Sequence, residues 1–404
     1  MKHFRRFRLS PVVSALRQAG CAALAAGTLV PGLAYTQLPA GGAVTHGTAA
    51  IRNVSPTQQR ITQASDKAII NWQSFSIGQP NSVVFAQPGA NSVVLNRVVG
   101  NDPSSIFGSL SANGQVFLVN PHGVFFGPGS RVDVTGLVAT TLNIRDGDFL
   151  SGNYLFSRDA LSPATAKVIN EGRITAAPGG YVVLAGDYAA NRGVVEARGG
   201  TVTLASGSRT TLDMQGDGLV RLAVSEKTIS DLAGVENAGQ LIADGGRVVM
   251  TAMVAREVSG TVVNNSGVVQ ARGTAERDGA IYLTGSGGDV ISSGALDASG
   301  STASGGTVQI LGERVGLIDN ASVNASGATG GGTVLVGGDF QGRPALSAVD
   351  GNPIQNARRT YIGPNATITA DAVQSGDGGK VIVWADGDTR YYGNISARGG
   401  ALSG

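Results

Sequence analysis

The chain has 404 residues, including 61 Gly and 14 Pro, and 42% of its residues are hydrophobic while 14% are charged. The glycines follow no Gly-X-Y period, which excludes collagen, and the hydrophobic fraction excludes an intrinsically disordered chain. So many glycines, with a formal net charge of only +2, indicate a long all-β protein built of many short strands and turns.

Residues 1–36 have the pattern of a secretory signal peptide. The basic start MKHFRRFRLS is followed by a short apolar stretch, Ala19–Val30, and by small residues that suit cleavage near Thr36. The apolar stretch falls short of the about 20 residues that a helix needs to span a bilayer. We therefore expect this segment to be removed rather than to anchor the chain.

Removal of the signal peptide changes the cysteine content and the net charge of the chain. The single cysteine, Cys21, leaves with it, and so do five of the 30 basic residues and none of the 28 acidic ones. The mature chain would hold 25 basic and 28 acidic residues, a net charge of 25 − 28 = −3. Nucleic-acid binding needs concentrated positive charge, so we expect no nucleic-acid partner.

The segment GQVFLVNPHGVFFGPGSRVDV, residues 114–134, predicts strands that are divided by a tight turn. Asn120 and Pro121 favour turns, and Gly123 can take the positive φ that other residues avoid. We interpret Asn120–Gly123 as a corner between successive sides of a coil. Upstream, NSVVF and NSVVL repeat at a spacing of ten residues, and Trp72 and Phe75 are expected to anchor the core near the end of the fold.

After residue 160 two strand patterns recur along the chain. The first is Gly-Gly-x-Φ-x-Φ, where Φ is apolar, and its Φ positions are Val182 and Leu184, Val202 and Leu204, Val248 and Met250, Val308 and Ile310, Val334 and Val336, and Val381 and Val383, with Ile281 and Leu283 in a variant copy. The second is Φ-x-Ala, often preceded by Asn or Gly, as in NEGRITA and NAGQLIA. Alternation of apolar and polar residues predicts strands with one buried and one wet face.

The order and spacing of these patterns favour a β-solenoid. Successive Gly-Gly strands are 20, 46, 33, 27, 26 and 47 residues apart. We interpret LVRLAV, Leu219–Val224, as an unmarked strand that divides the first long gap, and DFQGRPALSAVDGNPIQNARR as a surface loop in the second. Coils of about twenty residues without helices are typical of a parallel β-helix. An antiparallel sandwich remains the alternative. The chain stops where another Gly-Gly strand is expected, so we predict that the repeat region, residues 161–404, is incomplete at its C-terminus.

Several long phrases resemble the filamentous haemagglutinin family of secreted exoproteins, among them INWQSFSIG, SVVLNRVVGNDPSSIFGSLSANGQVFLVNPHGVFFGPGSRVDVTGLVATTLNI and GGKVIVWADGDTRYYGNISARGG. The resemblance implies a right-handed parallel β-helix with an N-terminal cap. It also implies that residues 37–160 form a two-partner-secretion, or haemagglutination activity, domain. Such a domain is recognised in the periplasm by the POTRA domains of an outer-membrane β-barrel, which exports the chain unfolded. The family's Asn-Pro-Asn-Gly secretion motif maps onto Asn120, Pro121, His122 and Gly123, with His in place of the second Asn.

Catalytic and metal chemistry has little support in the sequence. After residue 36 the chain has two histidines, His46 and His122, and no cysteine, so a His/Cys metal cluster is excluded. Candidate acids are scattered and show no recurring pair: Asp133, Asp146, Asp148 and Asp187. We expect no enzyme activity, no metal and no cofactor.

The sequence therefore predicts a secreted or surface-exposed exoprotein of a Gram-negative bacterium, exported through the periplasm, whose coils act as a filamentous adhesin towards a receptor or glycan on host or bacterial cells. Three alternatives stay open: a carbohydrate-active β-helix enzyme, a toxin-type exoprotein, and an exoprotein that scavenges haem or another ligand. For the last of these, Asp339–Arg359 is the only sizeable candidate loop.

Overall fold

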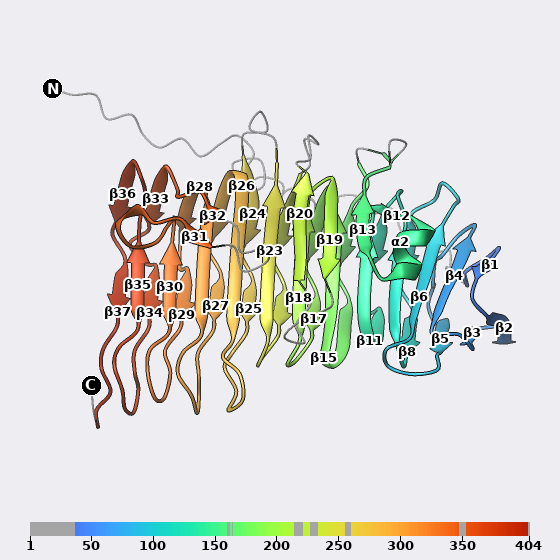
Figure 1. The fold of residues 1–404 in the computed structure, drawn as a ribbon, viewed down its shortest axis with the longest axis horizontal. Coiled ribbons are helices and arrows are strands. Elements are labelled where there is room, and N and C mark those ends of the chain that lie inside the picture. Colours follow the sequence, from blue (N-terminus) through green and yellow to red (C-terminus); the bar gives the residue numbers. More distant parts are fainter. Residues whose placement is uncertain are drawn as a thin grey trace, which may run out of the picture. The chain divides into compact units, whose positions relative to one another are not determined.

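Strands with alternating apolar residues, joined by glycine-rich turns, wind the chain into a stack of parallel coils (Figure 1). The structure is a computed structural model that describes residues 37–159, 162–163, 165–213, 221–226, 233–254, 260–346 and 353–402. The predicted signal peptide lies outside these described residues. Within them, no helix has both the length and the apolar character needed to cross a membrane.

Three parallel sheets form the sides of the coils, and each strand pairs with its equivalents in the neighbouring coils. The longest strands turn a corner and belong to two sheets: β11 (Arg131–Thr140), β15 (Arg173–Gly186), β26 (Ala280–Ser292) and β28 (Thr307–Leu317). We call the three sheets A, B and C. Besides segments of these four long strands, sheet A contains β4 (Lys67–Trp72), β6 (Val93–Val98), β9 (Gln115–Val119), β18 (Thr201–Ser206), β23 (Arg247–Met253), β30 (Thr333–Val336) and β35 (Lys380–Val383).

The other two sheets complete each coil. Sheet B adds β7 (Ser104–Ile106), β10 (Val124–Phe126), β14 (Val168–Asn170), β16 (Tyr188–Asn191), β21 (Gly234–Asn237), β24 (Thr261–Asn265), β33 (Arg359–Ile362) and β36 (Asp388–Tyr391). Sheet C adds β5 (Ser82–Ala86), β8 (Ser109–Ala112), β17 (Val194–Glu196), β22 (Gln240–Ile242), β25 (Val268–Gln270), β27 (Ala295–Asp297), β29 (Ser322–Asn324), β34 (Thr367–Thr369) and β37 (Asn394–Ser396).

The inward side chains of successive coils stack into columns that form one long core. Val202 pairs in register with Val182 and Val248, and all three are at most 1% exposed. Burying each such side chain contributes about 1.5–3 kcal/mol. The predicted inward positions are buried throughout the Gly-Gly strands up to Val336, while Val381 and Val383 in the last coil are half-buried. The predicted parallel β-helix is confirmed.

The N-terminal end of the core is capped by antiparallel strands. β1 (Ala43–His46) pairs antiparallel with β4, and β2 (Ala49–Ser55) pairs antiparallel with β3 (Gln58–Gln63). Leu38, Ala49 and Ile51 pack against the core. Trp72 and Phe75 are buried beneath this cap with their rings in edge contact at 5.4 Å, which confirms their predicted role as core anchors. The cap therefore covers the first coil's open edge and its apolar end.

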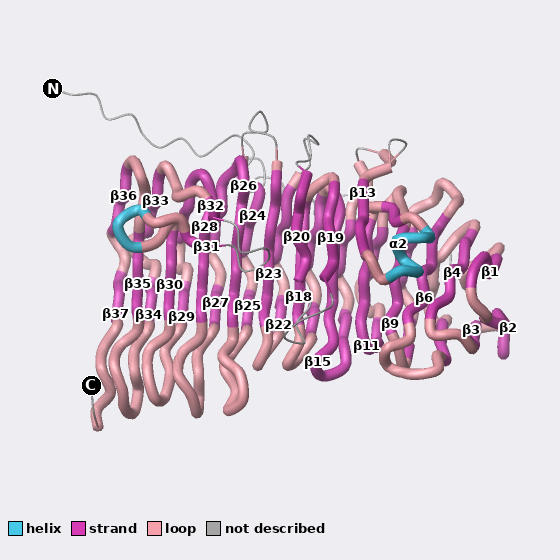
Figure 2. Tube along the Cα trace, in the orientation of Figure 1, coloured by secondary structure: helices cyan, strands magenta, loops and turns pink. Residues whose placement is uncertain are grey.

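An outer layer lies outside the coils, against sheet A. It consists of β12 (Asn143–Ile144), the short helix α2 (Asp146–Ser151), β13 (Tyr154–Ser157), β19 (Arg209–Asp213) and β20 (Arg221–Glu226), with all the strand pairs antiparallel. Figure 2 shows α2 as one of the few helical turns among strands and loops. The outer layer buries a second apolar cluster that includes Leu95, Phe117 and Phe149.

The outer layer corrects two sequence predictions. The segment LVRLAV is not a coil strand, because its β20 residues pair antiparallel with β19 while β18 pairs directly with β23. Apolar alternation alone does not distinguish a coil strand from a hairpin that packs on its outside. The expected wet face is also wrong for part of sheet A, since every residue of β9 and β18 is buried. The side chains of Thr201 and Thr203 point outward from the coil and are nevertheless buried.

The 47-residue gap between the Gly-Gly strands at Val334 and Val381 holds a surface insertion, as predicted. It contains the 3-10 helix η1 (Phe340–Gly342) and the hairpin β31 (Ala345–Leu346) and β32 (Pro353–Ile354), while β30 pairs directly with β35. Ala345 and Ile354 pack on Leu311, Leu335 and Ile382 outside sheet A. The predicted division between residues 37–160 and 161–404 remains a prediction. Hydrogen bonding between coils continues across this boundary, since β11 pairs in parallel with β15.

Candidate functional site

The turn Asn120–Gly123 forms the corner between β9 in sheet A and β10 in sheet B. Its ends are closed by the Gly123 amide, which donates to the Asn120 carbonyl oxygen at 3.0 Å. Gly123 has a φ of 121°, a conformation that side chains disfavour. A Cβ atom at this position would lie 3.2 Å from the Lys167 carbonyl oxygen of the next coil. The turn therefore requires glycine both for its backbone and for its close packing.

Asn120 ties this corner to the coils on both sides. Its side chain is fully buried, and Nδ2 donates to the Asp102 carbonyl oxygen and to Ser104 Oγ, both at 3.0 Å. Oδ1 accepts from the His122 amide at 2.9 Å, and the Asn120 amide donates to the Thr140 carbonyl oxygen. A buried polar group is stable only when it is hydrogen-bonded. Asn120 thus fixes the shape of the corner rather than displaying a side chain.

His122 and Pro121 are the accessible members of the turn, since both are half-buried. The His122 Nδ1 atom is buried and has no hydrogen-bond partner among the described residues. No group of three or more His, Cys, Asp or Glu residues in the described part of the chain could hold a metal ion. The structure therefore gives His122 no partner for acid–base or metal chemistry and leaves it as part of an exposed turn surface.

The candidate carboxylates are not brought together. Asp146 pairs with Arg97 at 2.7 Å, and Asp187 pairs with Arg158 at 3.1 Å. Asp133 lies exposed on β11, whereas Asp148 belongs to α2. Paired catalytic acids must face one substrate bond from about 5–10 Å apart. Asp146 and Asp148 share α2, whereas Asp133 lies on β11 and Asp187 lies between β15 and β16, and Asp146 and Asp187 are held in ion pairs.

Two cations that the sequence analysis missed attach the outer layer to the first coils. Lys67 of β4 donates to the carbonyl oxygens of Phe149 and Leu150 at the end of α2, at 3.1 and 2.8 Å. Arg97 of β6 donates to the Ile144 carbonyl oxygen at 2.6 Å and pairs with Asp146. Burial lowers the pKa of Lys67 from its ordinary value of 10.5. No local motif marks these residues, because their partners lie far along the chain.

A ladder of buried asparagines runs along the ends of the sheet B strands. Each side-chain Nδ2 donates to the Oδ1 atom of the next coil, at 2.8 Å from Asn170 to Asn191, 2.9 Å from Asn191 to Asn237 and 2.8 Å from Asn237 to Asn265. Asn265 then donates to Ser292 Oγ. The asparagine before the Φ-x-Ala pattern was the sequence signal for this ladder. Its role is to satisfy polar groups inside the corner.

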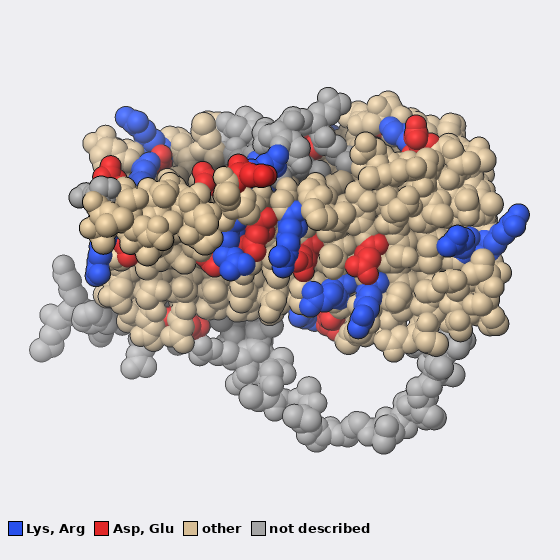
Figure 3. Space-filling view, turned by 90° about the horizontal axis from the view of Figure 1, so that it is seen from below, with Lys and Arg blue, Asp and Glu red and all other residues tan. Residues whose placement is uncertain are grey.

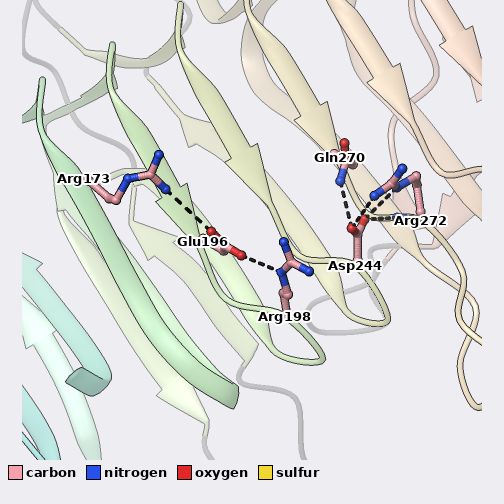
Figure 4. Close-up of polar contacts among 6 residues, drawn as sticks. All are labelled: Arg173, Glu196, Arg198, Asp244, Gln270 and Arg272. Atoms are coloured by element: carbon pink, nitrogen blue, oxygen red, sulfur yellow. Dashed lines mark hydrogen bonds and ion pairs between the residues drawn. The ribbon is translucent and has the colours of Figure 1, made fainter. Parts of the chain in front are cut away.

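Charged side chains of opposite sign pair between neighbouring coils. They do not gather in blocks of one sign. Figure 3 shows acidic and basic groups interleaved along one face of the molecule. On sheet C and the turn that follows it, Arg173 and Arg198 flank Glu196, and Gln270 and Arg272 donate to Asp244 at 2.8 and 2.9 Å (Figure 4). Nucleic-acid recognition relies on a concentrated positive surface, and the face in Figure 3 carries none.

The insertion Asp339–Arg359, the sequence candidate for a ligand-binding loop, is fastened to the last coils. Asn356 donates to Asp386 Oδ1 at 3.0 Å and to the Gly342 carbonyl oxygen at 2.8 Å. Lys380 pairs with Asp339. These contacts hold the base of the insertion against the coil stack.

Comparisons with known proteins agree with this architecture. The family model described as "TPS secretion domain" matches residues 36–298. The crystal structure of the HMW1 secretion domain from Haemophilus influenzae superimposes with a TM-score of 0.79 and 31% sequence identity, covering 90% of this chain and 91% of that chain.

Two curated relatives are both called "Heme/hemopexin-binding protein". One, from Haemophilus influenzae, is 31% identical over 261 residues, which are 59% of this chain and 27% of that protein. The other, from Haemophilus influenzae strain ATCC 51907 / DSM 11121 / KW20 / Rd, is 37% identical over 208 residues, 50% of this chain and 22% of that protein. The chain thus spans about a quarter of the length of these relatives.

Proposed function

Since this chain belongs to the family of two-partner-secretion (TPS) secretion domains, we propose that its N-terminal region directs export by POTRA recognition and that its coils mediate adhesion. Membership implies a secreted exoprotein of a Gram-negative bacterium with a cognate outer-membrane transporter as its partner. The match from residue 36 to residue 298 carries the proposal. It starts where the predicted signal peptide, residues 1–36, ends.

In this proposal the signal peptide takes the chain to the periplasm, and the transporter's POTRA domains read residues 37–160. The corner Asn120–Gly123 is part of the surface that they recognise. Its support is the resemblance of these residues to the family's secretion motif, together with the half-buried Pro121 and His122. Asn120 and Gly123 hold the turn in shape from below.

A binding assay tests the recognition step. Residues 37–404 would be titrated against the immobilised POTRA segment of the cognate barrel. We expect Gly123→Val to weaken binding about tenfold or more, because a β-branched residue disfavours positive φ, and His122→Asn to bind like the wild type. Circular dichroism of each variant shows whether the coils remain folded. Loss of binding in His122→Asn with normal binding in Gly123→Val would instead assign His122 a specific contact.

The coils are proposed to act without catalysis, as a filamentous adhesin for a receptor or glycan on host or bacterial cells. The regular stack offers a long outer surface, with side chains repeated at each coil. Binding of the purified, fluorescently labelled chain to epithelial and bacterial cells tests this role. Saturable binding supports adhesion, whereas binding no greater than that of a labelled control protein of equal size argues against it.

A second candidate function is binding of haem or of a haem-carrying protein, which the names of the two curated relatives favour. Imidazole is a common haem-iron ligand, and the described residues include the exposed His46 and the half-buried His122. Titration with haemin would show a shift of the Soret band if either histidine binds the iron, and His46→Ala and His122→Ala would identify which one. No shift in the wild type argues against direct haem binding.

A further inference from the structure

The segment that enters the first coil is fastened through its carbonyl oxygens. The Gln37 carbonyl oxygen accepts from the Gly78 amide at 2.9 Å and from Asn81 Nδ2 at 3.0 Å. Two residues later, the Pro39 carbonyl oxygen accepts from Gln59 Nε2 at 3.1 Å. These contacts hold Gln37 directly beside the Asn81 side chain.

Asn81, in the turn before β5, has a buried oxygen atom without a partner. The residue is 1% exposed, and its Nδ2 is used by the Gln37 carbonyl oxygen, but Oδ1 is buried and accepts no hydrogen bond from the described residues. Its main-chain groups are satisfied, since the amide donates to the Gly78 carbonyl oxygen at 2.8 Å and the carbonyl oxygen accepts from the Ser109 amide at 3.0 Å. The large majority of buried polar side-chain atoms have a hydrogen-bond partner. The Oδ1 atom therefore points to a further donor beside Gln37.

The main-chain nitrogen of Gln37 is a donor that belongs to the same contact, because the carbonyl group of Gln37 already binds the Asn81 side-chain amide. In the uncleaved chain this nitrogen is part of the Thr36–Gln37 peptide bond, where the planar amide fixes the direction of its single N–H group. Oδ1 receives no hydrogen bond from it. As the first nitrogen of a processed chain it is an ammonium, whose three N–H groups turn about the N–Cα bond. Hydrogen bonds from an ionised donor are also roughly twice as strong as those between neutral groups.

The surroundings of Gln37 suit both a chain start and a charge. Small residues, Ala34 and Thr36, precede Gln37 with one residue between them, which is the spacing of a signal cleavage site. Gln37 is exposed, so water can reach the N–H groups that do not point towards Asn81. The charge would thus avoid the penalty of full burial.

We propose that Asn81 Oδ1 is the binding site for the α-ammonium group of the processed chain, which begins at Gln37. The proposal rests on the signal peptide of the proposed function and adds a structural consequence of its cleavage. Water hydrolyses the Thr36–Gln37 bond, the Thr36 carboxylate leaves with the signal peptide, and the Gln37 nitrogen takes up a proton and donates to Asn81. Removal of the signal peptide thereby fastens the first residue of the exported chain to the first coil.

The reactivity of the α-amine tests the contact. Residues 37–404 are released from a fusion partner by a protease that cleaves directly before Gln37, and acylation of the N-terminus by a succinimidyl ester at about pH 7 is followed by mass spectrometry. We expect Asn81→Ala to react about tenfold faster than the wild type, because a hydrogen-bonded ammonium is less available as the free amine. Asn81→Asp loses the Nδ2 donor but keeps Oδ1, and should restore the slow rate. Equal rates in wild type and Asn81→Ala would overturn the proposal, as would equal rates in Asn81→Asp and Asn81→Ala.

Two controls separate this contact from general effects. Asn91→Ala changes the exposed asparagine of the second NSVV phrase and should react at the wild-type rate. In residues 35–404 the α-amine belongs to Tyr35, so Asn81→Ala should leave its rate unchanged. Melting temperatures of all variants show whether the coils remain folded. The mass of the secreted chain tests the processing step separately, since a chain that starts elsewhere, or whose Gln37 nitrogen is closed into a lactam ring, would overturn the proposal at that step.

Discussion

Asn120 shows how a single side chain can hold a corner of the stack. Its amide is completely buried, yet Nδ2 and Oδ1 both have partners, and those partners belong to the preceding coil and to the turn itself. Gly123 completes the corner with a backbone conformation that is strained for other residues. A turn at Asn-Pro-His-Gly could be predicted from these residue types. The partners Asp102, Ser104 and Thr140 could not, because only coil stacking brings them near Asn120.

Asn120→Ala is expected to destabilise the folded chain. It removes two side-chain hydrogen bonds to the preceding coil and leaves the buried Ser104 hydroxyl without this partner, which lowers the free energy of unfolding by about 2 kcal/mol. Urea denaturation followed by circular dichroism measures the loss. His122→Asn, at the half-buried neighbour, is the control and should change it by less than about 0.5 kcal/mol. Equal stabilities for Asn120→Ala and His122→Asn would contradict the proposed role of Asn120.

Asp244 is expected to give the protein a pH-dependent increment of stability. Burial alone would raise the pKa of its carboxyl, but hydrogen bonds from Arg272 and Gln270 in the next coil outweigh burial and hold that pKa below 3.8. A depressed folded-state pKa adds stability above the unfolded pKa, and this stability is lost as the pH falls through the folded value. Asp244→Asn should therefore lower the melting temperature at about pH 7, with a difference that shrinks below about pH 3.9.

Asp289 provides the comparison for Asp244. Its burial raises the pKa above 3.8 in spite of the hydrogen bond from Arg314. A raised folded-state pKa makes the carboxyl's contribution fall as the pH rises. As the pH rises, the stability that Asp289 contributes relative to Asp289→Asn should therefore fall, whereas the stability that Asp244 contributes relative to Asp244→Asn should rise. Melting temperatures of the wild type and both variants across pH measure these two trends. The same trend in both variants would show that these ion pairs do not control the acid response.

At the scale of the elements, each coil strand points alternate side chains into the core, and its outward face is either exposed to water or covered by the outer layer. Val308 in β28 is completely buried and pairs in register with Ile281 and Val334, while Gln309 points outward and is half-buried. The inward columns could be predicted from the Gly-Gly-x-Φ-x-Φ pattern. The cover could be predicted only in part: the unbroken apolar run Val116–Val119 in β9 indicates burial on both faces, whereas β18 has Thr201 and Thr203 on its outward face and no such signal.

Val308→Asp should disrupt the stack at its centre. An unpaired charge inside an apolar column has neither water nor a partner, so we expect a loss of about 3 kcal/mol or more in the free energy of unfolding. Gln309→Asp, one residue along the same strand, should cost less than about 1 kcal/mol. Chemical denaturation of both variants measures the difference. A larger loss for Gln309→Asp would mean that the inward face is misassigned.

The outer layer should detach more easily when its anchor is removed. Arg97 is the anchor because its guanidinium binds the Ile144 carbonyl oxygen and pairs with Asp146 in α2. Arg97→Ala should accelerate proteolytic cleavage within residues 143–157 without melting the coils. Arg198→Ala removes a more exposed arginine that pairs with Glu196 on the coil surface. Equal cleavage rates for the two variants would show that Arg97 does not hold the layer.

At the scale of the whole molecule, a repeated strand pattern and the resemblance of its first phrases led to the correct fold. The period identifies coils because each Gly-Gly strand pairs with the next copy, even across the 46-residue gap between Val202 and Val248. The period cannot identify where an insertion leaves the stack, and for that reason the prediction that LVRLAV is a coil strand is wrong. The sequence also gives no sign that Lys67 and Arg97 anchor the outer layer, because their partners at Phe149 and Ile144 come near them only after folding.

The account's central claim is that this chain is exported by a cognate outer-membrane barrel that reads its N-terminal region. The most direct measurement is the amount of folded chain in the culture medium of Gram-negative cells that express the full 404 residues with or without the cognate barrel. We predict accumulation in the medium only when the barrel is present, and retention in the periplasm when it is absent. Equal amounts in the medium under both conditions would contradict the claim.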